Sequence, residues 1–73
     1  MAHTHHKYKV LVLVKDRQTG DVYTYEKTYL SKMDMKRDIS LKYHVKRLSL
    51  VTPELYQGVS LKFEVSVFVS YQY

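Results

Sequence analysis

The chain has no cysteine and no tryptophan, and it holds only two glycines and one proline among 73 residues. Without cysteine, neither a disulfide bond nor a thiolate metal site can form. His44 is the one histidine outside the first seven residues. A zinc site needs three or four suitably spaced ligands, so we predict that the protein binds no metal. The sequence indicates no other cofactor.

Recognised catalytic patterns are lacking as well. No serine lies in a G-x-S-x-G context, and both glycines, Gly20 and Gly58, are expected in turns rather than in a phosphate-binding loop. Asp34 and Asp38 are spaced one helical turn apart, and Lys42 follows at the same spacing. We interpret these carboxylates as solvated groups balanced by the lysine. We therefore predict that the protein is not an enzyme.

Long apolar runs are also missing. The longest, Val10–Val14, is far shorter than the roughly 20 residues that a membrane-spanning helix needs. Residues 1–8 are polar and predict no signal peptide. We expect a cytoplasmic protein that does not bind membranes. Residues 1–7, which hold three histidines, are predicted to be a disordered tail, and residues 8–73 are predicted to form a single domain.

Alternating stretches in the first half of this domain predict a β-hairpin. Tyr8–Lys15 is apolar on both faces and predicts a central strand that is buried on both sides. A turn is expected next, because the Asp16 side chain can accept turn amides and Gly20 can adopt a positive φ. Val22–Leu30 is rich in β-branched and aromatic residues and predicts the return strand, with Tyr23, Tyr25 and Tyr29 on one face.

The pattern changes at Ser31, where we predict a helix over residues 32–43. Ser31 and Asp34 form S-x-x-D, which is typical of a helix start, and the acidic residue suits the helix dipole. The apolar residues of this stretch also alternate, so a strand remains the alternative. The helical stripe expected to pack on the sheet is Met35, Ile39 and Tyr43.

The second half of the chain predicts two further strands. Val45–Thr52 is the first, and the stretch from Thr52 to Gly58 is expected to be a connection, because Pro53 donates no ladder hydrogen bond. Val59–Tyr71 is the long final strand, with Phe68 on its solvent side. The predicted fold is α+β: a small antiparallel sheet, in chain order β-β-α-β-β, with one helix on one face. An all-β fold is the alternative.

Because so small a core is thin and the last strand is a long, apolar edge, we expect a homodimer.

The net charge of +5 favours anionic partners, although it also serves solubility. Tyrosine and arginine are enriched at protein interfaces, so the leading hypothesis is a binding module for an acidic partner protein. The alternative is nonspecific binding of single-stranded nucleic acid, with phosphates on the basic residues and bases stacked on exposed tyrosines. The residues predicted for this contact are Tyr23, Tyr25, Tyr29, Lys32, Lys36, Arg37, Lys42, Lys46 and Arg47.

The first half of the chain also resembles a known family. The residues that carry the resemblance are Tyr8-x-Val10, the Asp16 to Gly20 turn, Tyr23-x-Tyr25-Glu26 and Leu30-Ser31. Together they resemble the hairpin-then-helix of phage uracil-DNA glycosylase inhibitors. The resemblance implies a phage-encoded accessory protein that binds a host factor in the host cytoplasm. Those inhibitors mimic DNA with acidic residues, whereas this chain is basic, so no functional residue is carried over.

Overall fold

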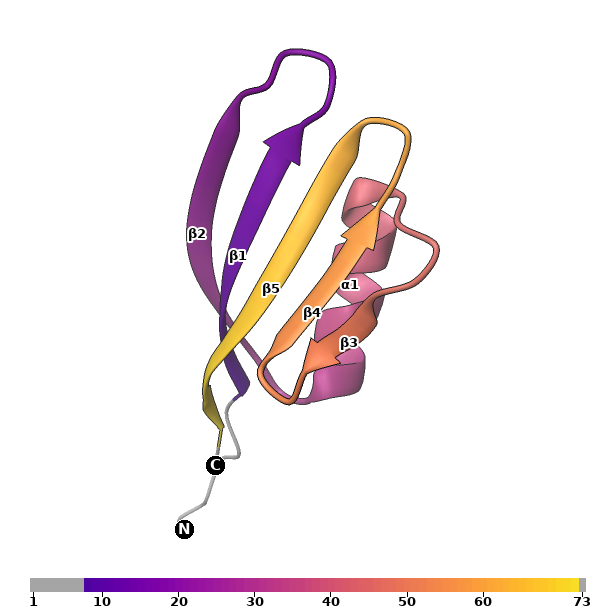
Figure 1. The fold of residues 1–73 in the computed structure, drawn as a ribbon. Coiled ribbons are helices and arrows are strands. Elements are labelled where there is room, and N and C mark those ends of the chain that lie inside the picture. Colours follow the sequence, from indigo (N-terminus) through magenta and orange to yellow (C-terminus); the bar gives the residue numbers. More distant parts are fainter. Residues whose placement is uncertain (1–7, 73) are drawn as a thin grey trace, which may run out of the picture.

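The computed structural model describes residues 8–72, with side chains for residues 8–70. Within this range the fold is α+β: five antiparallel strands form one sheet and a single helix lies against one face of it (Figure 1). The elements are β1 (Tyr8–Asp16), β2 (Val22–Tyr29), α1 (Lys32–Tyr43), β3 (Ser49–Thr52), β4 (Leu55–Val59) and β5 (Phe63–Gln72). Across the sheet the order is β2-β1-β5-β4-β3. The predicted tail at residues 1–7 lies outside the described residues.

The core lies between α1 and the sheet face that it covers. Val12 of β1 lies opposite Val67 of β5, and the neighbouring pair is Val14 with Val65. All four side chains are at most 1% exposed. The helix covers these side chains with its predicted stripe of Met35, Ile39 and Tyr43.

The other face of the sheet is open in the part of the chain that the structure describes. β1 is paired on both sides, as predicted, but Leu11 and Leu13 on its second face are only half-buried. The prediction that this strand is buried on both faces is therefore wrong. One helix is enough to cover one face of the sheet, and no second layer of the described chain reaches the other.

The hairpin turn forms as its residues predict. The Asp16 carboxylate accepts hydrogen bonds from the amides of Gln18 at 2.8 Å and Thr19 at 3.2 Å. Gly20 has φ +83° and donates its amide to the Asp16 carbonyl at 2.8 Å. An Asp side chain that mimics a backbone turn, followed by a glycine with positive φ, is sufficient to reverse the strand.

The helix also has its predicted bounds, which excludes the strand alternative for this segment. Ser31 is the N-cap, and its hydroxyl accepts the Asp34 amide at 3.2 Å. At the other end His44 is left-handed, with φ 59° and ψ 35°, and the Val45 amide closes the helix on the Ser40 carbonyl at 3.0 Å. No helix within residues 8–72 has the length and apolar character needed to cross a membrane.

The second half differs from the prediction. The segment expected to be a connection contains β4, because Pro53 occupies a tight turn after Thr52 and the chain returns at once from Leu55. The long final strand is interrupted at residues 60–62, so β5 begins at Phe63. β5 pairs with β1 on one side and with β4 on the other, and so it is not an edge strand.

Gly58 lies inside a strand, and its close neighbours explain why this residue is a glycine. It is buried in β4, directly beneath the loop that leaves α1. A Cβ atom at this position would overlap the Val45 side chain and lie 3.0 Å from the Arg47 carbonyl oxygen. Gly58 is therefore required by the close approach of two backbones and not by a turn, as the sequence had suggested.

We predict that Gly58→Ala lowers the free energy of unfolding by about 1–3 kcal/mol, because the added methyl group meets backbone and packed side chain. Urea unfolding followed by circular dichroism measures the change. Gly20→Asn is the matched control, since nothing lies within 4 Å of a Cβ there and asparagine tolerates positive φ. If the Gly58→Ala variant had the same free energy of unfolding as the parent protein, the close approach of the two backbones would be contradicted.

Candidate functional site

The tyrosines predicted for partner contact lie on the face of β2 that turns toward α1. Tyr29 is buried, at 8% exposed, and its hydroxyl donates to the Asp38 carboxylate at 2.5 Å. The hydroxyls of Tyr25 and Tyr43 lie 2.8 Å apart, and Tyr23 donates to the same Tyr43 hydroxyl at 3.4 Å. Tyr23 alone of the three remains about half exposed, with its ring stacked on that of Tyr25. The expectation of three exposed tyrosines on a sheet face is wrong.

Burial and hydrogen bonding change the acidity of this cluster. Burial raises the pKa of Tyr29 well above its ordinary value, and the hydrogen bond to Asp38 raises it further. Burial, followed by the hydrogen bonds with Tyr23 and Tyr25, raises the pKa of Tyr43 in the same way. The bond from Tyr29 lowers the pKa of Asp38, against the opposite effect of its burial. These tyrosines therefore hold β2 to the helix as neutral phenols.

The predicted basic residues do not form one patch. Lys36 lies over the Tyr56 ring of β4 at 5.8 Å, whereas Lys42 lies over the Tyr25 ring of β2 at 5.2 Å, so the two flank the helix on opposite sides. Arg37 is exposed and points away from the sheet, about 200° around the helix from the buried Ile39. Of the others, Lys32 is exposed at the start of the helix, and Lys46 and Arg47 are exposed in the loop that follows it.

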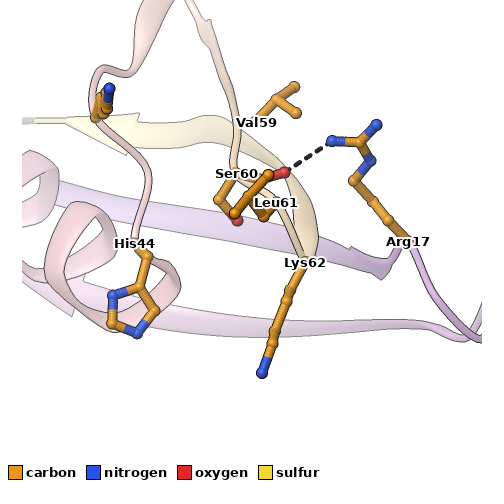
Figure 2. Close-up of a pocket in the computed structure, with 7 residues that line it drawn as sticks. Arg17, His44, Val59, Ser60, Leu61 and Lys62 are labelled. Atoms are coloured by element: carbon orange, nitrogen blue, oxygen red, sulfur yellow. Dashed lines mark hydrogen bonds between the residues drawn. The ribbon is translucent and has the colours of Figure 1, made fainter.

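A basic groove lies at the turn end of the sheet, where only Lys46 of the predicted residues is found. Its basic side chains come from four segments: Arg17 from the β1–β2 turn, His44 from the end of α1, Lys46 from the next loop and Lys62 from the β4–β5 turn (Figure 2). The groove has a volume of about 770 Å³, and no carboxylate is among its lining residues. We call these seven lining residues the basic groove: Arg17, His44, Lys46, Val59, Ser60, Leu61 and Lys62.

The sheet topology brings these segments together. Asp16 pairs with Phe63, which places the β1–β2 turn beside the β4–β5 turn. The helix ends at the same place, because the ring of Tyr43 meets that of Phe63 edge-on at 5.4 Å. Gly58 lets the loop that carries Lys46 pass over β4. The groove therefore depends on long-range pairing and on one missing side chain.

Backbone hydrogen bonds hold the groove's rim. Arg17 donates its amide to the Lys62 carbonyl at 2.7 Å and its guanidinium to the Ser60 carbonyl at 2.8 Å (Figure 2). Ser60 in turn accepts the Phe63 amide on its hydroxyl at 3.1 Å. In Figure 2 the Arg17 side chain turns toward the β4–β5 turn, while Lys62 points away from it. The cations are thus spread around the opening, and Arg17 also forms an ion pair of 3.9 Å with Glu64, which is not a lining residue.

Two groove residues have unusual settings. His44 adopts the left-handed conformation at the helix C-cap, where glycine is the ordinary residue. Leu61, at the tip of the β4–β5 turn, is 94% exposed. A left-handed backbone costs free energy for a residue other than glycine, and such strained positions concentrate at functional sites. Sequence reasoning considered His44 as a metal ligand and did not single out Leu61, because backbone conformation and burial cannot be read from the residue type.

Comparisons with protein-family models, with curated proteins and with solved structures found no match to this chain. The phage-inhibitor resemblance therefore stays a prediction. The basic groove has to be interpreted from its own geometry.

We predict that stability falls as the pH rises above about 10, the ordinary pKa of tyrosine. The unfolded chain releases the phenol protons of Tyr29 and Tyr43 first, because their folded-state pKa values are raised, so the unfolded state then binds fewer protons. Each such group contributes a slope of up to about 1.4 kcal/mol per pH unit.

Urea unfolding between about pH 9 and 11.5 tests this prediction. Lysine deprotonation affects the parent protein and Tyr43→Phe alike, so the difference between their slopes isolates Tyr43. Parallel slopes would show that the hydroxyl of Tyr43 is not held in its protonated form by the fold.

Proposed function

We propose that this protein is a non-enzymatic binding module that holds an acidic segment of a partner protein in the basic groove. The observation that carries the proposal is that four basic side chains, from four separate segments, line one opening that has no carboxylate among its lining residues. Arg17, Lys46 and Lys62 are the cations of this set, and Arg17 forms an ion pair of 3.9 Å with Glu64, which is not a lining residue. Among the described residues no carboxylate forms an ion pair with Lys46 or Lys62. Such a surface also attracts acidic partners before contact.

The apolar residues of the groove favour a protein over a nucleic acid. Leu61 is almost fully exposed and Val59 is 58% exposed, and both line the groove beside the cations. Protein interfaces combine apolar anchors with a charged rim in this manner. No aromatic residue lines the groove, and the rings needed for base stacking are engaged elsewhere. Nucleic-acid binding is therefore the alternative function that the binding experiment has to exclude.

Other parts of the proposal rest on the sequence alone. A phage-type accessory protein or inhibitor, a cytoplasmic location and a homodimer remain predictions, and each agrees with a module that acts by contact. Within residues 8–72 no cluster of three potential metal ligands occurs.

A charge-matched pair of variants tests the groove. Lys46→Gln with Lys62→Gln removes two groove cations, whereas Lys32→Gln with Arg37→Gln removes two cations of the helix. Both double variants have the same net charge. The probes are a fluorescent Glu- and Leu-rich peptide and a fluorescent oligothymidine, each titrated at two salt concentrations.

We expect the groove variant to bind the peptide about tenfold more weakly, since two exposed ion pairs contribute up to about 1 kcal/mol each, and the helix variant to bind almost as the parent does. Leu61→Ser should weaken peptide binding without changing net charge. Equal losses of peptide affinity in both double variants would show that binding depends on the net charge and not on the groove. Tighter, strongly salt-dependent binding of the oligonucleotide would favour the nucleic-acid function instead.

A further inference from the structure

We propose that two copies of this chain pack face to face through the open side of the sheet. This surface lies opposite α1 and is formed by residues of β2, β1, β5 and β4 that point away from the core. Leu11, Phe68 and Leu55 lie in one row across β1, β5 and β4, because each is the register partner of the next. Leu13 lies beside this row, and Phe68 remains 40% exposed.

The open face is electrically neutral on a chain of net charge +5. Its strands contribute two lysines and two glutamates. Lys9 forms an ion pair of 3.7 Å with Glu26 at one end. At the other end Lys15 lies opposite Glu64 in the register of β1 and β5, and Glu64 forms an ion pair of 3.9 Å with Arg17 of the neighbouring turn. The excess positive charge is therefore located elsewhere, on the helix and around the groove. Two copies can approach through this face without the repulsion that their net charges impose on other approaches.

Charge complementarity selects one arrangement of the two copies. A two-fold axis parallel to the strands, between β1 and β5, places β1 of each copy over β5 of the other. Lys15 then meets Glu64 of the second copy, and Leu11 meets its Phe68. An axis across the strands would instead place Lys9 over Lys15, which is repulsive. The arrangement is that of two sheets packed about 10 Å apart with roughly parallel strand directions.

The area is sufficient for a reversible dimer. Four strands spaced about 4.8 Å apart and paired over about eight residues present roughly 500 Å² in projection. Two copies then bury about 1,000 Å², which is near the lower limit of specific interfaces. This inference shares with the proposed function only the prediction of a homodimer. It also replaces the edge of the last strand as the contact, because β5 is paired on both sides.

A pair of complementary variants gives the sharpest test. Lys15→Glu and Glu64→Lys each place like charges across the proposed interface, so each variant alone should be monomeric. Mixed together they should form a heterodimer, because the glutamate introduced in one variant then meets the lysine introduced in the other. Their net charges, each changed by two to +3 and +7, still repel, so only local pairing explains association. Thermal unfolding of each variant verifies that both are folded.

Sedimentation velocity on the full chain, from about 10 µM to 1 mM, is the measurement. A chelator is included because His3, His5 and His6 can bind stray metal ions. We expect the parent to dimerise, Phe68→Ser to weaken dimerisation by at least about tenfold, and Leu41→Ser on the outer side of α1 to leave it unchanged.

A monomeric parent over the whole range would overturn the proposal and leave the face to another occupant. A parent dimer that Phe68→Ser does not weaken would also overturn it, and so would a mixture of the charge variants that remains monomeric. The peptide titration of the groove is independent of all three results, so the two proposals can fail separately.

Discussion

The rest of the structure depends on the antiparallel pairing of the first strand with the last. Val10, Val12 and Val14 of β1 lie in register with valines of β5, although more than fifty residues separate them in the chain. This pairing makes the flat apolar surface on which α1 rests, and it gives β2 and β4 their inner neighbours. Contacts so distant in sequence close a long loop, so this pairing carries a cost in chain entropy and slows folding relative to local contacts.

The tyrosines, the groove's basic side chains and a row of apolar side chains lie on three different surfaces of the molecule. Tyrosines on the helix-covered face are used internally, because Tyr43 and Asp38 take the hydroxyls of β2. Basic side chains gather at the turn end, where no carboxylate lines the groove. The open face has a balanced charge and an apolar centre. A chain of this size thus places its internal packing, its basic groove and its exposed apolar side chains at different parts of one sheet.

Local features were predictable from the sequence and long-range ones were not. The turn at Asp16 and the cap at Ser31 depend on side chains that bond neighbouring amides, so their residues were sufficient evidence. The alternation in β2 correctly placed its three tyrosines on one face, but it carried no information about which face the helix would cover. Gly58 was misassigned to a turn because the backbone that approaches it comes from residues 45–47.

The candidate site shows the same limit more strongly. Lys46 was predicted because it lies in a run of basic residues, whereas Arg17 and Lys62 are isolated cations in two turns far apart in sequence. Only the register of β1 with β5 brings those turns together. The helix cations were adjacent in sequence, but the helix itself disperses them, since residues six apart lie on different sides of it.

The pairing of Tyr8 with Gln72 brings the two ends of the described chain side by side. The first and last described residues lie one strand spacing apart, about 4.8 Å, and at the end of the sheet away from the basic groove. A short linker there would join the two ends without disturbing any layer, and the exposed Pro53–Glu54 turn offers a place to open the ring. The shape of this protein is thus compatible with a circular permutation.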